Sequence, residues 1–237
     1  MRLDQYVAER LCCTRTRAAN IVKTGGVTVN GKSTRKAGQE VSERDSIEIS
    51  DTVKFSSLGG VKLDNALKTF SVDLAGKECL DIGAANGGFT HCMLLNGAKS
   101  VSAVDITVAF PEELSADPRV RIYDGVNVKD IGSLLPEGSF DLITVDLSFI
   151  SLVGLFSVFY PLLKDGGDLI VLYKPQFEVG KKALPKSGVV HSEKESDKAL
   201  ARVIKSAEEC GFHYVDACPI PEFFANKNKE RTVLFRK

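Results

Sequence analysis

Two charged residues stand at the ends of apolar runs in the second half of the chain. Asp146 closes the run FDLITVD, and Lys174 closes the run DLIVLYK. Runs of this kind are typical of buried parallel strands, whose carboxyl ends meet at one edge of a sheet. An acid and an amine at one edge can together bind a hydroxyl group and take its proton. We therefore expect Asp146 and Lys174 to lie side by side in an active site.

A glycine-rich loop, DIGAANGGFT at residues 81–90, follows the first apolar run of the same region. Its small residues let the backbone approach a ligand, and the helix after it presents unpaired N–H groups. Ala85 stands where a dinucleotide-binding loop has its middle glycine, which disfavours contact with a pyrophosphate. Asp105 ends the next strand, 22 residues after Gly83, where a carboxylate can accept both hydroxyls of a ribose. A ribose without a pyrophosphate indicates S-adenosylmethionine. The residues expected to hold this cofactor are Asp81, Gly83, Ala84, Asn86, Gly87, Gly88, Phe89, Thr90, Asp105, Asn127 and Asp146.

Two more charged residues are placed to join the first pair. Lys62 opens the helical stretch KLDNALKTF, and Glu230 precedes the last strand run, TVLF. Methyl transfer from a sulfonium to a ribose hydroxyl needs alignment of the reacting atoms and removal of the hydroxyl proton, which a lysine accepts only when uncharged. Desolvation and a neighbouring cation lower the pKa of a lysine, whereas a carboxylate raises it. We expect Lys174 to be the base, Asp146 to orient it, and Lys62 with Glu230 to position the ribose.

Alternating strand and helix patterns surround these residues. β-rich runs at ECLDIG, SVSAVDI, VRIYD, FDLITVD and DLIVLYK alternate with helical stretches at residues 87–97 and 151–163. This rhythm predicts an α/β fold with a doubly wound, mostly parallel sheet. We place this domain at residues 61–237, after a linker at 55–60 in which Gly59 and Gly60 allow a bend.

The first 36 residues carry a net charge of +6, from eight Arg or Lys against two Asp or Glu, although the whole chain has a net charge of zero. Such an excess suits a phosphate backbone, and a solvated basic face is the plainer alternative. Helical spacing in RLDQYVAERL and the N-cap candidate Thr14 before RTRAANIVK predict two helices. The run VTVNGKS, with its Asn30-Gly31 pair, predicts a hairpin, and DSIEIS predicts a further strand.

This order of elements resembles the S4 RNA-binding domain, which has an R-L-D start, an S/T-R-x-x-A helix and a G-x-V-x-V-N-G turn. We assign residues 1–54 to such a small α+β domain. The resemblance implies RNA as its ligand. The basic residues expected to contact RNA are Arg2, Arg15, Arg17, Lys23, Lys32, Arg35 and Lys36.

Composition excludes several classes of protein. The chain has 237 residues, 43% of them hydrophobic and 26% charged, which is typical of a globular protein with one large domain or two unequal ones. No apolar stretch approaches the ~18–20 residues that cross a bilayer, and the amino terminus lacks the apolar block of a signal peptide. The six cysteines show no metal-binding spacing, so we expect no metal and a cytoplasmic location.

Five segments together, GGVKLDNAL, DIGAANGGFTHCML, FDLITVDLSFISL, KPQFEVG and SGVV, resemble the TlyA family, also labelled hemolysin A. In that family an S4 domain precedes an FtsJ-like, Rossmann-like class I methyltransferase domain. The resemblance implies S-adenosylmethionine-dependent 2′-O-methylation of ribosomal RNA, with cytidine as the expected nucleotide and rRNA or ribosomal subunits as partners. It also implies a Lys-Asp-Lys-Glu tetrad, which by motif falls on Lys62, Asp146, Lys174 and Glu230.

Two other functions stay open on the sequence. A cytolysin, suggested by the second family label, would need an insertable segment, and no helical stretch in the sequence is long enough to span a membrane. A non-catalytic RNA-binding protein that keeps the cofactor fold is the other alternative, against which the Asp146 and Lys174 pair argues. Phe149 and Phe177, three residues after that pair, could stack on a base, although core packing is the more common fate of a phenylalanine.

Overall fold

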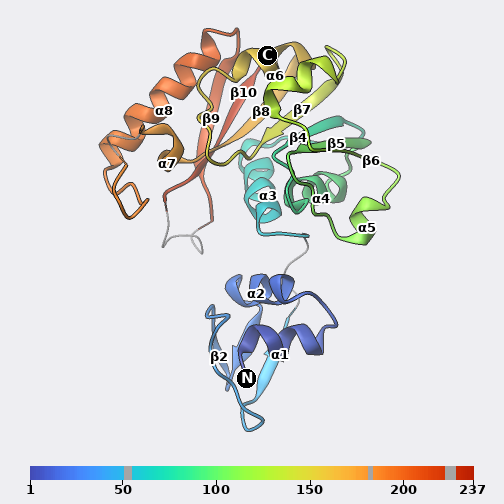
Figure 1. The fold of residues 1–237 in the computed structure, drawn as a ribbon, viewed down its shortest axis with the longest axis vertical. Coiled ribbons are helices and arrows are strands. Elements are labelled where there is room, and N and C mark those ends of the chain that lie inside the picture. The colour runs from blue at the N-terminus through green and yellow to red at the C-terminus, as the bar shows by residue number, and fades with distance from the viewer. Residues whose placement is uncertain (51–54, 181–183, 222–227) are drawn as a thin grey trace. The chain divides into compact units, whose positions relative to one another are not determined.

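The structure, a computed structural model, describes residues 1–50, 55–180, 184–221 and 228–237. It divides into two compact units, Met1–Gly59 and Gly60–Lys237, which Figure 1 shows as a small unit and a larger one. The expected linker at 55–60 ends inside a helix, because Gly59 and Gly60 form the first turn of α3. Residues 51–54, which we assigned to the first domain, lie outside the described residues.

The small unit contains two helices and a three-stranded antiparallel sheet of order β2-β1-β3. The hydroxyl oxygen of Thr14 accepts a hydrogen bond from the Arg17 N–H at 3.2 Å, which makes Thr14 the N-cap of α2 as expected. Asn30 and Gly31 both have positive φ, as a two-residue hairpin turn requires. The elements are α1 Leu3–Arg10, α2 Arg15–Lys23, β1 Val27–Val29, β2 Lys32–Ser33 and β3 Ile47–Ile49.

The large unit is built on a seven-stranded sheet of order β6-β5-β4-β7-β8-β10-β9. Strands β4 to β8 run parallel, and β10 is antiparallel to both of its neighbours. The α/β class and the mostly parallel sheet are therefore confirmed. The elements are α3 Gly59–Phe70, β4 Glu78–Ile82, α4 Gly88–Leu95, β5 Ser100–Asp105, α5 Glu112–Ser115, β6 Val120–Asp124, η1 Val128–Ser133, β7 Phe140–Val145, α6 Phe156–Phe159, η2 Tyr160–Leu162, β8 Leu163–Tyr173, α7 Pro175–Glu178, α8 Glu193–Glu208, β9 His213–Pro219 and β10 Arg231–Arg236.

The prediction of a helix at residues 151–163 is mostly wrong. Only Phe156–Phe159 is α-helical, and a 3-10 turn, Tyr160–Leu162, follows it. Gly154 has a φ of +86°, which is incompatible with a right-handed helix, and Pro161 has no backbone N–H to continue one. Strand β8 then begins at Leu163, five residues before the run DLIVLYK.

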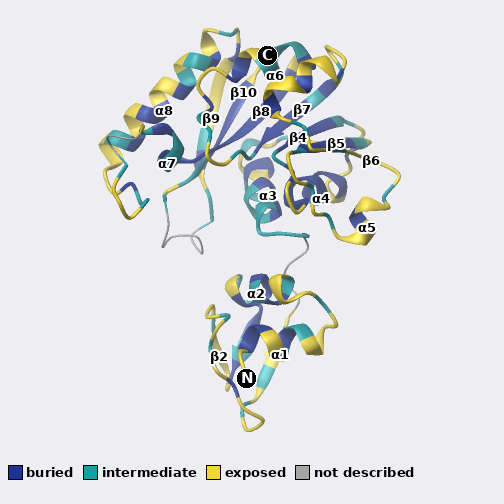
Figure 2. Cartoon of the chain, in the orientation of Figure 1, coloured by how far each residue is buried: buried dark blue, intermediate teal, exposed yellow. Residues whose placement is uncertain are grey.

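Helices cover both faces of the sheet, so its central strands are buried (Figure 2). Residues of η1, α6 and α8 pack against one face, and Figure 1 shows α3 and α4 on the other side of the sheet from α6. Phe156, Phe212 and Phe235 pack in this core with ring centroids 5.6 to 6.3 Å apart. Burial on both faces explains why strands β7 and β8 are continuous apolar runs. The first charged residues after these two runs, Asp146 and Lys174, therefore stand at the carboxyl ends of the strands.

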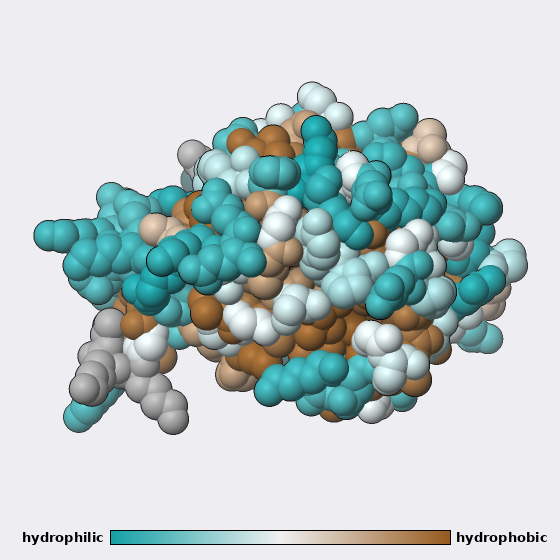
Figure 3. Space-filling model, turned by 90° about the horizontal axis from the view of Figure 1, so that it is seen from above, coloured by the Kyte–Doolittle hydropathy of each residue, from teal (hydrophilic) through white to brown (hydrophobic). Residues whose placement is uncertain are grey.

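The surface is mixed. On the face shown in Figure 3, hydrophilic side chains cover most of the area and hydrophobic ones gather in smaller patches between them. Scattered exposed apolar side chains are ordinary in globular proteins. An exposed apolar residue therefore calls for a functional explanation only where it adjoins a site.

Candidate active site

Asp146 and Lys174 form an ion pair at the carboxyl edge of the sheet. The Lys174 Nζ lies 2.6 Å from Asp146 Oδ1, and the two side chains are 11% and 23% exposed. Lys174 Nζ also donates a hydrogen bond of 2.9 Å to Ser148 Oγ. Pro175 begins α7 and ends the strand pairing beyond Tyr173, which leaves Lys174 at the very end of β8. The two residues thus lie together, as their positions after strands β7 and β8 predict.

Lys62 of α3 and Glu230, the residue before β10, form a second ion pair. Their Nζ and Oε2 atoms are 2.6 Å apart, and each side chain is 14% exposed. In the antiparallel register of β8 and β10, Arg231 lies opposite Tyr173, and Glu230 and Lys174 are the next residues beyond this last pair. Neighbouring strands are ~5 Å apart. The structure therefore brings the four predicted residues to one edge of the sheet, as two shielded ion pairs.

A cavity of about 350 Å³ lies beside Asp146, at the ends of β4, β5 and β7. This is the point where the strand order reverses around β4, and ligands of doubly wound sheets bind at such a point. Polar groups from Asp105, Asn127 and Asp146 meet apolar side chains there. The lining residues are Ile82, Gly83, Ala85, Val104, Asp105, Ile106, Val126, Asn127, Val128, Asp146, Leu147, Ser148, Phe149 and Ile150.

The glycine-rich loop passes very close to the end of β7. A Cβ atom on Gly83 would lie 2.4 Å from the carbonyl oxygen of Asp146, and Gly83 has a φ of +85°. Ala85 also has positive φ, at +44°, although it carries a side chain. A single non-glycine residue in this region costs ~1–2 kcal/mol. The loop therefore tolerates strain at Ala85 in order to bring its backbone to the cavity.

Asp105 is held at the rim of the cavity by the loops around it. Its Oδ2 accepts a hydrogen bond from the Ala85 N–H at 3.0 Å, and its Oδ1 accepts one from the Thr107 N–H at 3.0 Å. A carboxylate has about four acceptor positions, so two remain for a ligand. Asn127 caps η1 by accepting from the Lys129 N–H, and its amide lines the same cavity.

Asp81 does not line the cavity. Its carboxylate is completely buried and accepts hydrogen bonds from Thr90 Oγ1 at 2.6 Å and Thr144 Oγ1 at 3.1 Å. Burial raises the pKa of Asp81 to about 7. Asp81, at the start of the glycine-rich loop, is therefore hydrogen-bonded to Thr90 in α4 and to Thr144 in β7. These bonds hold the loop in place without contact with the cavity. The other expected cofactor residues outside the lining are Ala84, Asn86, Gly87, Gly88, Phe89 and Thr90.

Phe149 is 91% exposed, so core packing is excluded for this residue. It lines the cavity, and its φ of +67° is unusual for a residue with a bulky side chain. Its ring centroid lies 5.2 Å from that of Phe177, and the Lys174 Nζ lies 6.0 Å from the Phe177 centroid. An aromatic pair thus stands beside the Asp146 and Lys174 ion pair.

Sequence reasoning missed two polar residues that support the site. Ser148 accepts from Lys174, and Glu178 accepts from Ser151 Oγ at 2.6 Å and the Leu152 N–H at 2.8 Å. Burial raises the pKa of Glu178. Ser148 lies in DLSFISL and Glu178 in KPQFE, two segments that carry the family resemblance. This was the only feature of the sequence that could have pointed to these residues. Their partners are separated by 26 or 27 residues and cannot be paired from spacing.

In the small unit, six of the seven predicted RNA-binding residues are exposed, and Arg17 is half-buried. Arg2 and Arg15 also form ion pairs with buried Asp4, at 2.6 and 3.2 Å. The hydrogen bond from Arg2 and the charge of both guanidinium groups lower the pKa of Asp4 to about 2. These two arginines therefore also hold the domain together, which leaves Lys23, Lys32, Arg35 and Lys36 as the exposed basic residues without such a role in the described structure.

Family models match both parts of the chain. The model of the FtsJ-like methyltransferases matches residues 55–237, and the model of the S4 domain matches residues 1–47. These matches cover the unit that holds the cavity and the unit that holds the basic residues.

Named relatives match over nearly the whole chain. Hemolysin A of Brachyspira hyodysenteriae is 34% identical, with 97% of each chain covered. The 16S/23S rRNA (cytidine-2′-O)-methyltransferase TlyA of Mycobacterium tuberculosis is also 34% identical, over 93% of this chain and 84% of that protein. A solved structure named as a hemolysin of Streptococcus thermophilus is 31% identical, with a TM-score of 0.74, and covers 100% of this chain and 88% of that chain.

Proposed function

We propose a function from one premise: the chain belongs to the TlyA, or hemolysin A, family, in which an S4 domain precedes an FtsJ-like methyltransferase domain. The function is S-adenosylmethionine-dependent 2′-O-methylation of ribose, at cytidine, in ribosomal RNA. The observation that carries it is the Lys174 Nζ, 2.6 Å from Asp146 and beside a cavity of about 350 Å³. A cytoplasmic location stays a prediction.

The cavity suits S-adenosylmethionine, which when bound supplies an electrophilic methyl group on a sulfonium. The two remaining acceptor positions of Asp105 suit the ribose hydroxyls. Ile106, Val126 and Val128 offer an apolar surface for an adenine, and the amide of Asn127 offers a polar contact at its edge. The residues present therefore fit the cofactor, with Asp146 at the end of the cavity nearest Lys174.

Lys174, once its ammonium has released a proton, would accept the proton of the 2′-hydroxyl. The hydroxyl oxygen would form its bond to the methyl carbon as the methyl–sulfur bond breaks, with the neutral thioether S-adenosylhomocysteine as the leaving group. Asp146 and Ser148 contact the Lys174 Nζ from two sides and so fix its direction. The ion pair between Lys62 of α3 and Glu230, just before β10, positions the ribose. Fixing the reacting groups in this way supplies a large part of the rate of a bimolecular step.

The base of the target nucleotide stacks on Phe149, whose exposed ring is held beside Phe177. Base-on-ring stacking contributes ~1–3 kcal/mol and tolerates different bases. Lys23, Lys32, Arg35 and Lys36 of the S4 domain bind phosphates of the same RNA.

The deciding experiment is transfer of tritiated methyl groups to separated ribosomal subunits and to naked rRNA. Nuclease mapping of the resistant ribose then locates the product. Lys174→Ala should abolish transfer and leave cofactor binding nearly intact, because the side chain does not line the cavity. The matched control is Lys164→Ala, which removes a lysine paired with Asp141 at the other edge of the sheet. Retained turnover by Lys174→Ala would refute the role of this base.

The two alternatives make different predictions. A non-catalytic RNA-binding protein would bind rRNA with no methyl incorporation by the wild-type protein. A cytolysin would lyse cells with the purified Lys174→Ala variant as well as with the wild type. Within the described part of the chain, no helix combines the length and apolar character that crossing a membrane requires.

A further inference from the structure

Two segments of the site are joined to each other at their beginnings, middles and ends. The first, residues 146–152, follows β7, and the second, residues 174–178, follows β8. Three contacts join them in order. Lys174 contacts Asp146 and Ser148, the ring of Phe177 contacts that of Phe149, and Glu178 binds Ser151 and Leu152.

The last contact of this series is made by a buried carboxylate. Glu178 is 8% exposed, and each of its oxygens accepts one hydrogen bond from the first segment. Its backbone carbonyl accepts a hydrogen bond of 2.8 Å from Arg202 of α8, which anchors Glu178 to the body of the domain. Ser151 Oγ in turn accepts from the Val153 N–H at 3.1 Å, so the hydrogen bonds continue along the loop.

The first segment needs such an anchor. At its start, the Asp146 N–H donates a hydrogen bond of 2.9 Å to the Ile82 carbonyl oxygen, which continues the pairing of β7 with β4 by one residue. Phe149 lies three residues later with positive φ and an almost fully exposed ring. A bulky residue stays in that conformation only where the surrounding structure imposes it. Glu178 fixes the chain directly beyond Phe149, so the strained residue is held from both ends.

We propose that Glu178 is a positioning residue for methyl transfer, which acts by holding segment 146–152 against segment 174–178 and thereby aims Phe149 and Ser148 at the substrate and at Lys174. This inference rests on the proposed function. Glu178 does not line the cavity, but residues 146–150 of the segment that it holds do. Its loss should therefore lower the rate of transfer most and weaken cofactor binding to a smaller extent.

The kinetic test compares Glu178→Ala, Glu178→Gln and Ser151→Ala. Glu178→Ala should lower kcat by ~10²-fold, the cost of a small misplacement of reacting groups, while the Kd for S-adenosylmethionine changes far less. Glu178→Gln should restore most of the rate, since its amide can accept from Leu152 and donate to Ser151. Ser151→Ala removes one hydrogen bond and should give an intermediate rate, and it keeps the test usable if Glu178→Ala does not fold.

Asp168→Asn is the matched control. Asp168 is a buried carboxylate that binds Arg236 at 2.9 Å, away from both segments. The Asp168→Asn substitution should lower the thermal stability of the protein. It should leave kcat unchanged at a temperature where the variant is folded. If Glu178→Ala lowers kcat no more than Asp168→Asn does, the inference is wrong.

A second measurement needs no activity. The chain contains no tryptophan, so Phe149→Trp introduces a single tryptophan in the middle of segment 146–152, which can be excited apart from the tyrosines. The anisotropy of this tryptophan should fall when Glu178→Ala is added and recover with Glu178→Gln. An anisotropy that is equal in all three proteins would overturn the inference. A wild-type protein that transfers no methyl groups would instead overturn the proposed function, and the anisotropy would still decide whether Glu178 holds segment 146–152 in place.

Discussion

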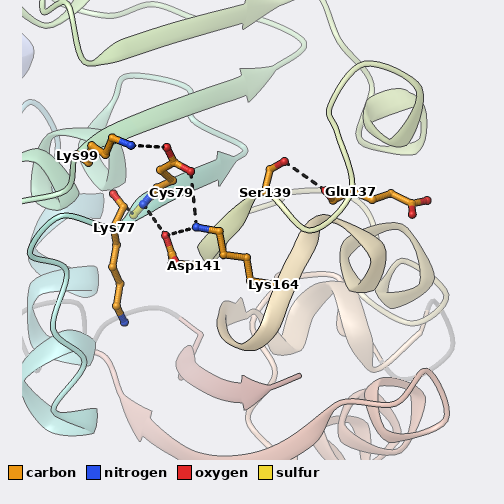
Figure 4. Close-up of polar contacts among 8 residues, drawn as sticks. Lys77, Cys79, Lys99, Glu137, Ser139, Asp141 and Lys164 are labelled. Atoms are coloured by element: carbon orange, nitrogen blue, oxygen red, sulfur yellow. Dashed lines mark hydrogen bonds and ion pairs between the residues drawn. The ribbon is translucent and has the colours of Figure 1, made fainter.

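The two edges of the large sheet carry the same kinds of residue in different surroundings. At the amino edge, Lys99 pairs with Glu78 at 2.9 Å, and Lys164 pairs with Asp141 at 2.9 Å (Figure 4). At the carboxyl edge, Lys62 pairs with Glu230 and Lys174 pairs with Asp146, each at 2.6 Å. Distance alone therefore does not distinguish a structural ion pair from one in a site.

Exposure does distinguish them. Lys99 and Lys164 are 66% and 39% exposed, whereas Lys62 and Lys174 are 14% and 11% exposed. Water screens the amino-edge pairs, and exposed pairs of this kind contribute ~0–1 kcal/mol to stability. At the carboxyl edge both pairs are shielded, and a cavity adjoins the pair of Asp146 and Lys174. The comparison shows that shielding beside a cavity, rather than charge at a strand end, marks the candidate active site.

The largest expected difference is between Lys62→Ala and Lys99→Ala. Each removes one ammonium from a pair with a glutamate, but only Lys62→Ala takes the lysine from a shielded glutamate, Glu230. We expect Lys62→Ala to lower the rate of methyl transfer by ~10²-fold, since a positioning contact is lost. Lys99→Ala should keep the wild-type rate. Steady-state transfer assays check this, and equal rates for the two variants would break the comparison of the edges.

A smaller effect is expected from glycines at the two ends of β4. Gly83→Ala places a Cβ 2.4 Å from the Asp146 carbonyl oxygen, whereas Gly76→Ala, at a similar φ of +72°, meets no atom within 4 Å. Both variants share the left-handed strain of ~1–2 kcal/mol. Only Gly83→Ala adds overpacking of ~1–3 kcal/mol and displaces Asp146.

Chemical denaturation and cofactor titration measure this difference. Gly83→Ala should have the lower free energy of unfolding and the weaker binding of S-adenosylmethionine. If Gly76→Ala were equally impaired in both measurements, the close approach of Gly83 to the Asp146 carbonyl oxygen would not explain the loss.

A third contrast is a pH dependence of opposite sign in two aspartates. The pKa of Asp81 in the folded protein is about 7, above the ~3.9 of an unfolded chain. The folded protein thus retains a proton that the unfolded chain has released, and this lowers the free energy of unfolding as the pH rises from about 4 to 7. For Asp141, burial alone would raise the pKa, but hydrogen bonds from the Glu78 N–H and Lys164 outweigh it and lower the pKa.

Denaturation of wild type, Asp81→Asn and Asp141→Asn at several pH values checks both signs. The stability of wild type relative to Asp81→Asn should fall as the pH rises between about 4 and 7, where each pKa unit corresponds to ~1.4 kcal/mol. Relative to Asp141→Asn, the stability of wild type should rise as the pH rises toward about 4 and then level off, because Asp141 loses its proton at lower pH in the folded protein than in the unfolded chain. Parallel curves for all three proteins would contradict the contrast.

Much of the site could be predicted from the sequence because strand ends are visible in it. Asp146 and Lys174 follow continuous apolar runs, and a strand buried on both faces is typically such a run. Parallel strands place all such ends at one edge, so the pairing of these two residues follows from their positions alone. The same local reasoning predicts the Thr14 cap and the Asn30-Gly31 turn, since both depend on neighbours within a few residues.

Only the tertiary structure decided which way the remaining side chains face. Asp81 turns beneath the loop to two threonines, Phe149 turns outward, and Glu178 reaches a segment 26 residues away. These outcomes depend on strand register and on contacts between distant segments, which no local pattern encodes. A sequence states what chemistry a strand end can carry, and packing determines whether that chemistry meets a ligand, because burial and direction belong to the assembled sheet.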